Sequence, residues 1–285
     1  MDSSDRELKP YAELRSAQIV NEDLSMSNLV HANLASSNLY LSNLTGANLY
    51  CANLTSANLS FTDLNDSNFC STVAGNANFD DATMDCANFS KSDLSRSTFK
   101  NTISNNTNLH SSKLVNAILT GSIFHDCGFT DCDMSHCDFR NSSLHNSNFT
   151  GAKLLSCDLQ GAIAPYSNFC EANLADSNMN NAVFSGAMFA RANLEGATLS
   201  NSDLTFSIFV EARLIKCNVS RSNLSNANFS DSNLAGANLS DAKCESTNFS
   251  GANLSGVNFS GADLTFANFE GANLEDAKFE GSKRS

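Results

Sequence analysis

Basic residues are scarce in this chain. Lys and Arg number 17 against 30 Asp and Glu, so the formal net charge is −13, and residues 16–90 contain no Lys or Arg. A groove for direct nucleic-acid binding is therefore excluded, because such grooves need clustered positive charge. No stretch approaches the length of apolar sequence that a membrane span requires. The charged opening residues are followed by no apolar segment, so we expect no signal peptide and a cytoplasmic location, with secretion as an effector left open.

In place of such features, the sequence has a five-residue repeat. Residues 251–274 read GANLSGVNFSGADLTFANFEGANL, and this frame places a central residue at 14, 19, 24 and every fifth position to 279. The frame holds 54 centres without insertion or deletion, and 45 of them are Leu or Phe. A small residue stands two positions before nearly every centre. Such an array must be recognised before individual motifs are interpreted.

The period of five excludes a helix and favours extended chain. A helix turns about 100° per residue, so apolar centres five apart would wind around every face. In an extended segment, the centre and the small residue two positions earlier share one side, and the residue between them points outward. Two polar residues remain in each unit to turn the chain. Units of this kind bury their apolar residues only by coiling and stacking, which predicts a β-solenoid.

The repeat resembles the pentapeptide-repeat family, whose signature A(N/D)LXX appears here as Ala32-Asn33-Leu34 and Ala252-Asn253-Leu254. The resemblance covers residues 12–279. It implies an all-β fold, a right-handed four-sided parallel β-helix with twenty residues per turn. The 54 pentads would then make about 13 coils.

Sorting the centres at a period of twenty gives nearly pure columns, which agrees with a four-sided coil. One column is almost entirely Leu and includes Leu34 and Leu54. Another is an unbroken run of Phe, and we expect it in the core: Phe129, Phe149, Phe169, Phe189, Phe209, Phe229, Phe249 and Phe269.

The ends of the array and its weaker units suggest local departures from regularity. Residues 1–11 are polar and are a candidate cap, residues 12–279 form one continuous β-helix, and residues 280–285 are a short polar tail. The last coil lacks an evident cap, so either that end stacks on another copy or a partner, or the tail folds over it; we favour association, as a homodimer. Pro165 cannot donate to a strand ladder, so a bend or bulge is expected there.

Ten cysteines and a His-rich stretch suggest a metal site, but their register argues against one. Cys127, Cys132 and Cys137 occupy the small inward position, whereas His125 and His145 occupy outward corner positions. We therefore interpret the inward cysteines as packing residues and expect no metal site, with a surface pair of His125 and His145 left as an alternative.

The sequence shows no catalytic set. It has no P-loop and no Gly-x-Gly-x-x-Gly motif. Active sites need loops or a pocket, which an uninterrupted array does not supply. We expect no enzyme activity and no cofactor.

Two surface features are candidates for binding. Val20, Tyr40, Leu41 and Phe61 follow the centres of one column at outward positions and predict an exposed apolar partner surface. The stretch without basic residues supplies a candidate acidic surface: Asp63, Asp66, Asp80, Asp81 and Asp85.

These features favour a rigid scaffold that binds a protein partner. The family resemblance implies an alternative, a DNA mimic that binds the type II topoisomerase DNA gyrase and inhibits it or protects it from quinolone-like poisons. About 13 coils at ~4.8 Å would extend roughly 65 Å. A DNA mimic of that length would need about 38 charges at one per ~1.7 Å, so a net charge of −13 restricts mimicry to a local stretch such as residues 16–90.

Overall fold

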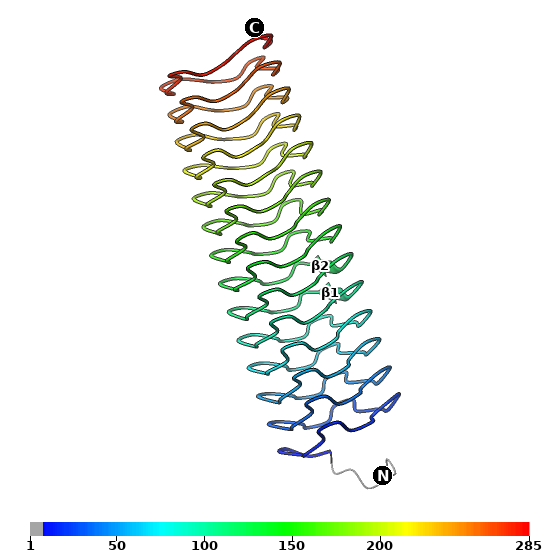
Figure 1. The fold of residues 1–285 in the computed structure, drawn as a ribbon. Coiled ribbons are helices and arrows are strands. Elements are labelled where there is room, and N and C mark those ends of the chain that lie inside the picture. The colour runs from blue at the N-terminus through cyan, green and yellow to red at the C-terminus, as the bar shows by residue number, and fades with distance from the viewer. Residues whose placement is uncertain (1–7, 285) are drawn as a thin grey trace. The chain divides into compact units, whose positions relative to one another are not determined.

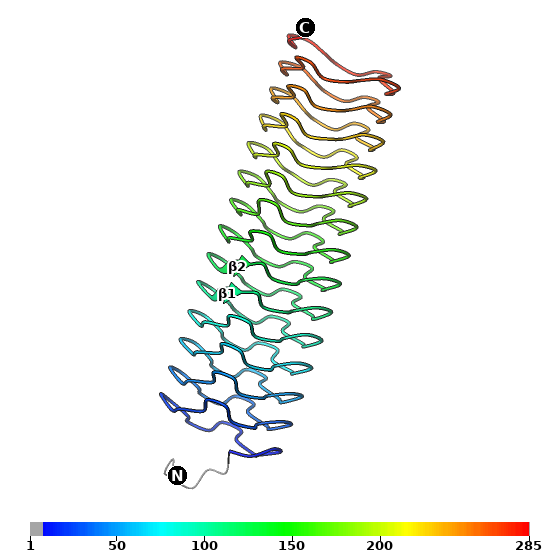
Figure 2. The same cartoon turned by 180° about the vertical axis from the view of Figure 1, so that it is seen from behind.

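The computed structural model describes residues 8–284. The chain forms two compact units, Met1–Ser143 and Leu144–Ser285, called here the N-terminal and C-terminal units. Within each unit the backbone winds in repeated coils (Figure 1, Figure 2). The described residues contain no helix that is long and apolar enough to cross a membrane.

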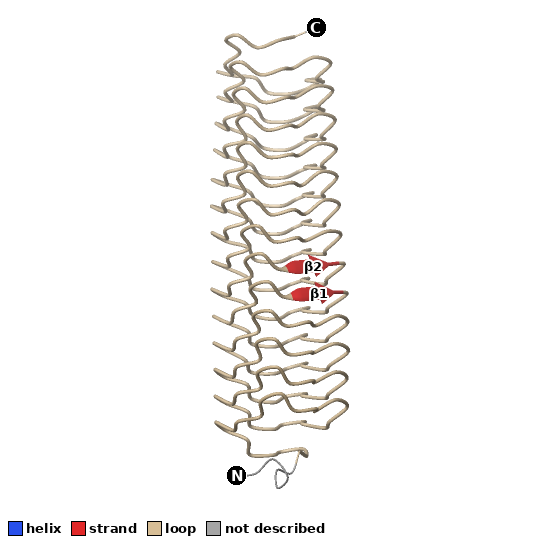
Figure 3. Cartoon of the chain, turned by 90° about the vertical axis from the view of Figure 1, so that its right-hand side faces the viewer, coloured by secondary structure: helices blue, strands red, loops and turns tan. Residues whose placement is uncertain are grey.

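Consecutive coils are joined by parallel pairing at a spacing of twenty residues. In the N-terminal unit the pairs run from Glu13↔Asn33 to Ile123↔Ser143, and in the C-terminal unit from Asn148↔Asn168 to Asp263↔Lys283. Nearly all are single bridges. The two strands of the described chain, β1 (Ile103–Asn105) and β2 (Ile123–His125), pair in parallel (Figure 3). A four-sided parallel β-helix is the result, as the resemblance of the repeat implied and the columns at a period of twenty agreed.

Each side of a coil contributes hydrogen bonds in both directions. The Leu34 N–H donates forward to the Asn53 carbonyl at 2.7 Å, and the Asn53 N–H donates back to the Ala32 carbonyl at 2.9 Å. The outward Asn residues add a second ladder, as where Asn253 Nδ2 donates to Asn233 Oδ1 at 3.1 Å. The polar exterior of the repeat therefore contributes to coil stacking as well as to solubility.

Every corner of the described coils uses a left-handed residue, two positions after the centre. At Ser36, for example, φ is 57°, and the turn is closed by the Ser37 N–H donating to the Leu34 carbonyl at 3.0 Å. A positive φ at the third residue identifies a type II-like turn. All such positions from 11 to 281 have positive φ, and none holds Val, Ile or Thr, the residue types for which that conformation is most strained.

The bend expected at Pro165 is absent, so that prediction was wrong. Pro165 occupies the second position of a turn, where a fixed φ near −65° is favoured and no ladder N–H is needed. Ladder bonds continue on both sides, from Ala164 N–H to the Val183 carbonyl at 2.7 Å and from Tyr166 N–H to the Ser185 carbonyl at 3.0 Å. The proline therefore fits the repeat.

The core of each unit is a column of Leu and Phe lined by small residues. Leu34 and Leu54 have no exposed surface. In the C-terminal unit, Phe189 stacks on Phe169 at 5.0 Å and on Phe209 at 4.7 Å between ring centroids. Phe269 differs from the sequence expectation, because it is partly exposed in the last described coil, where no later described coil covers it.

Candidate functional site

The four apolar residues singled out in the sequence lie along one corner of the N-terminal unit, which we call the apolar ridge (Val20, Tyr40, Leu41 and Phe61). The Tyr40 and Phe61 rings meet edge to face with centroids 5.7 Å apart. Leu41 and Phe61 are 47% and 50% exposed. These two occupy successive left-handed corner positions, which point outward, so the turn geometry itself presents them to solvent.

The acidic residues singled out in the sequence lie on the coil side that begins at this corner, called here the acidic face (Asp63, Asp66, Asp80, Asp81 and Asp85). Phe61 and Asp66 form the two corners of that side, and Asp63 lies between them, bridged to Thr83. The Phe61 N–H donates to the Asp80 carbonyl at 3.0 Å, so Asp80 and Asp81 lie one coil further along. The structure thus places the acidic face directly beside the apolar ridge.

Local hydrogen bonds fix the carboxylates of Asp63, Asp80, Asp81 and Asp85. Oδ1 of Asp80 accepts from the Lys100 N–H at 2.8 Å, and Oδ1 of Asp85 accepts from the Asn105 N–H at 2.7 Å. Oδ1 of Asp63 accepts from the Asn65 N–H at 3.0 Å. Within residues 8–284, no member of the acidic face is in an ion pair. Their charge is therefore available to a partner.

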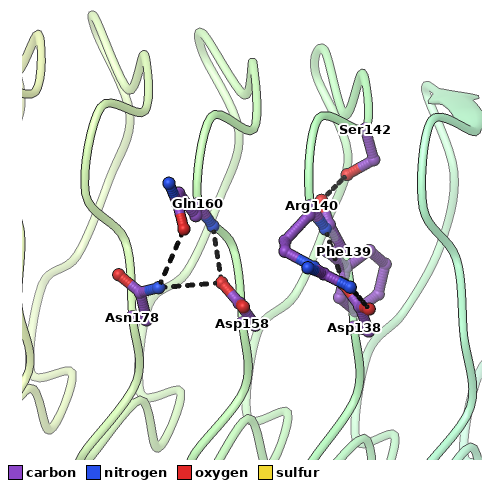
Figure 4. A network of polar contacts seen from close by, with 7 residues as sticks. All are labelled: Asp138, Phe139, Arg140, Ser142, Asp158, Gln160 and Asn178. Atoms are coloured by element: carbon purple, nitrogen blue, oxygen red, sulfur yellow. Dashed lines mark hydrogen bonds and ion pairs between the residues drawn. The ribbon is translucent and has the colours of Figure 1, made fainter.

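Elsewhere in the molecule, ion pairs cancel acidic charge (Figure 4). In the N-terminal unit, Arg140 Nη2 lies 2.6 Å from Asp138 Oδ2. Burial opposes ionisation of Asp138, but the hydrogen bonds and charge of Arg140 hold its pKa below the usual value. In the C-terminal unit, Asp158 Oδ1 accepts hydrogen bonds from the Gln160 N–H and from Asn178 Nδ2, both at 3.0 Å.

Sequence reasoning missed an aromatic group near the start of the N-terminal unit. The Tyr11 and His31 rings stack with centroids 4.9 Å apart, and Tyr50 meets His31 edge-on at 6.1 Å. Tyr11 is 69% exposed. The twenty-residue separation of Tyr11 and His31 was the available signal. Most of the predicted cap, residues 1–11, lies outside the described residues.

The Cys- and His-rich stretch separates into an inner and an outer set. Cys127 and Cys132 are buried, and burial raises the pKa of each thiol to about 11. His125 Nε2 lies outside, 2.7 Å from Ser143 Oγ. Among residues 8–284, no three His, Cys, Asp or Glu side chains are grouped as a metal site would require. Cys127, Cys132 and Cys137 are buried at the inward positions expected from the register, and the pairing of His125 with His145 stays a prediction.

The parallel pairing at twenty residues, the left-handed corners and the stacked Leu and Phe core define an all-β repeat protein of the β-helix class. The family model for pentapeptide repeats matches residues 27–66, 62–101, 105–141, 127–163, 167–205, 207–243 and 242–281. The chain belongs to the pentapeptide-repeat family and has its right-handed, four-sided β-helix. Members of this family are generally structural or interaction proteins rather than enzymes.

Several solved structures are similar to this chain. QnrB1, a plasmid-mediated fluoroquinolone resistance protein, is 16% identical over 68% of this chain and 89% of its own, with a TM-score of 0.34. HetL from the cyanobacterium Nostoc sp. strain PCC 7120, involved in heterocyst differentiation regulation, is 22% identical over 95% and 91%, with a TM-score of 0.24. Rfr23 from the cyanobacterium Cyanothece 51142 is 24% identical over 47% and 87%, with a TM-score of 0.27. No curated protein matches the chain.

Proposed function

We propose that this protein is a non-enzymatic interaction protein that binds a protein partner through the apolar ridge and the adjoining acidic face. The observation that carries this proposal is the exposure of Leu41 and Phe61 at a corner beside aspartates that have no ion-pair partner among residues 8–284. Exposed apolar side chains next to uncompensated charge are typical of binding surfaces. The partner would present apolar side chains flanked by Lys or Arg.

Paired substitutions at the ridge test this proposal. In affinity capture from cell lysate, the double variant Leu41→Asp with Phe61→Asp should no longer retain the partner that the wild type retains. Both apolar contacts are lost in this variant, and negative charge is added. Asp is itself common at these left-handed corners, so the coils should still form. Phe266→Asp, an exposed corner residue of the C-terminal unit, is the matched control. Proteins captured equally by all three forms, with unchanged circular dichroism, would count against the proposal.

A second candidate function is local mimicry of DNA toward DNA gyrase, and the charge of residues 16–90 favours it. That stretch carries seven acidic residues and no basic one. It makes almost four coils, which extend about 18 Å at ~4.8 Å per coil. A DNA duplex of that length carries about 11 charges, so the local density is much closer to DNA than the average over the whole chain.

A supercoiling assay decides between the two functions. Purified protein is titrated into gyrase with and without a fluoroquinolone, beside a variant with Asp63, Asp66, Asp80 and Asp81 changed to Asn. Inhibition or protection that the variant loses would favour mimicry. An unchanged reaction at all protein concentrations would eliminate the gyrase function and leave the protein-binding proposal standing.

Two further parts of the proposal concern assembly and location. A homodimer through the last coil is supported by Leu274, which is 36% exposed. The tail covers part of the same coil, because the Arg284 guanidinium lies 3.7 Å from the centroid of the Phe279 ring. Leu274→Asp should then halve the mass measured by light scattering, and an unchanged mass would contradict the homodimer.

A cytoplasmic location is supported by ten free cysteines, since reducing compartments keep thiols unpaired.

A further inference from the structure

The C-terminal unit carries a second exposed apolar region, which we call the corner surface. It covers two adjoining sides of three consecutive coils and the corner between them. Its members are Ile163, Tyr166, Val183, Met188, Phe206 and Ile208. Tyr166 and Phe206 are 70% and 64% exposed, and Ile163, Met188 and Ile208 are each more than a third exposed.

The coil pairing makes these residues one continuous surface. Ile163 bridges Val183 on one side, and Met188 bridges Ile208 on the next. The corner between the two sides holds Tyr166, Gly186 and Phe206 in successive coils. A Cβ on Gly186 would lie 2.7 Å from two carbons of the Tyr166 ring. The missing side chain at Gly186 therefore lets that ring lie flat across the corner.

The fold does not require apolar residues at these positions. In the same column as Met188 and Ile208, the preceding and following residues are Asn168 and Asn228. Asn228 accepts a hydrogen bond from Asn248 Nδ2 at 3.0 Å, a ladder contact that Met188 and Ile208 cannot make. Compared with coils that carry Asn in this column, the three coils of the corner surface lack outward hydrogen bonds and expose apolar area. This combination points to a role in binding.

The border of the corner surface is acidic. Asp203 follows Val183 in its column, and Glu171 and Glu211 lie at the far corner of the side that holds Met188. Arg191, at that corner, is held by Glu171 at 2.6 Å. That ion pair cancels the charge of Glu171, so the border acids without an ion pair among residues 8–284 are Asp203 and Glu211. A second copy of this surface, or an anionic membrane, would meet repulsion at the border.

We propose that the corner surface binds an amphipathic helical segment of another protein, with an apolar stripe bordered by Lys and Arg. Three coils at ~4.8 Å give an apolar region about 14 Å long. A ten-residue helix is about 15 Å long, so the apolar stripe along three turns of such a helix matches the length of the corner surface. The acidic border pairs with the basic edges of the helix. This inference does not depend on binding at the apolar ridge of the N-terminal unit.

A designed peptide tests the proposal directly. The probe is a fluorescein-labelled synthetic helix of Leu and Lys, with Leu at i, i+3, i+4 and i+7, and a scrambled peptide of equal charge is its control. Fluorescence anisotropy should show binding of the amphipathic peptide and much weaker binding of the scrambled one. Equal binding of both peptides would overturn the proposal, because charge alone would then explain the affinity.

The matched variants remove the surface without changing charge. Tyr166→Asn, Phe206→Asn and Ile208→Asn together introduce the residue that the repeat already uses at Asn226 and Asn228, so the coils should remain intact. This triple variant should weaken binding more than about tenfold, the loss expected when aromatic anchors are removed. Phe266→Asn changes an aromatic residue in the same corner column, 71% exposed, and should leave the affinity unchanged.

Three further measurements distinguish the other occupants. Leu41→Asp with Phe61→Asp should bind the peptide as the wild type does, which separates this surface from the apolar ridge. Self-association in sedimentation that the triple variant abolishes would identify a second copy and overturn the proposal. Binding to phosphatidylcholine/phosphatidylglycerol vesicles that the triple variant loses would identify a membrane surface and overturn it as well.

Discussion

The Tyr166 ring lies across the backbone of Gly186, one coil further along the chain. Its carbons Cδ1 and Cε1 occupy the space that a Cβ on Gly186 would approach to 2.7 Å. The corner surface therefore depends on a residue that contributes no side chain to it.

Gly186→Ala should lower the melting temperature more than Gly256→Ala. Both glycines are left-handed, with φ of +67° and +65°, and each alanine costs about 1–2 kcal/mol for that conformation. Only Gly186 also displaces a ring, because the nearest atom to a Cβ on Gly256 is 3.9 Å away. Differential scanning calorimetry of both variants, repeated with Tyr166→Asn, checks this. The difference should disappear when Tyr166 is absent, and its persistence would contradict the explanation.

Phe189→Ala should destabilise the C-terminal unit by about 3–5 kcal/mol. The Phe189 ring is fully buried between Phe169 and Phe209, so truncation leaves a cavity in a column that cannot collapse sideways. Urea unfolding followed by circular dichroism measures the loss. Phe266→Asn, at an exposed corner, should change stability by less than about 0.5 kcal/mol. Similar midpoints for the two variants would argue against a stacked core.

Acid should reduce the contribution of Asp263 to the free energy of unfolding. Hydrogen bonds from the Thr265 hydroxyl and from Lys283 lower the pKa of Asp263 to about 2, below the usual range of an aspartate. A depressed pKa means that the folded state favours the carboxylate. The stability that the Asp263 carboxylate confers is therefore present above about pH 4 and is lost as the pH falls through about 2.

The difference in melting temperature between the wild type and Asp263→Asn measures this contribution. It should be largest near neutral pH and should shrink as the solution is acidified below about pH 4. A difference that stays constant over that range would show that Asp263 contributes packing or a neutral hydrogen bond rather than charge.

Alkylation should divide the cysteines into two groups. Cys86 is exposed and Cys51, Cys70 and Cys170 are partly exposed, whereas the other six are buried. Burial raises the pKa of Cys217 to about 12, so its thiol stays protonated and unreactive near pH 8. Intact-mass measurement with iodoacetamide should show at most four adducts on native protein and ten in denaturant. Rapid native modification of Cys217 would show that the coils open readily.

Much of the fold follows from the sequence because inward and outward positions recur without interruption. The Phe column was visible at a period of twenty, and Phe169, Phe189 and Phe209 do stack. Tyr40 and Phe61 were grouped for the same reason, and their rings meet in the structure. The period thus identifies neighbours that lie one above another in the coil.

Neighbours around the coil were harder to recognise. Tyr166, Met188 and Phe206 are separated by 22 and 18 residues, so no single column contains them all. Only the turn geometry shows that a corner column lies between two sides and joins them. The error at Pro165 has the same origin, because a ladder position and a turn position differ by only two residues in the repeat.

The spacing of the hydrogen-bond ladder also determines how this molecule tolerates deletions. Each ladder residue pairs with the residue twenty positions away, and each side of a coil contributes five residues. Removing residues 226–230 would therefore keep every later pairing but rotate all following sides by one quarter turn relative to the preceding coils. Removing 226–245 would restore the alignment and shorten the array by one coil. Insertions and deletions of single repeats can thus redirect a binding surface around the axis without redesigning the core, which gives the fold an unusual route to new partners.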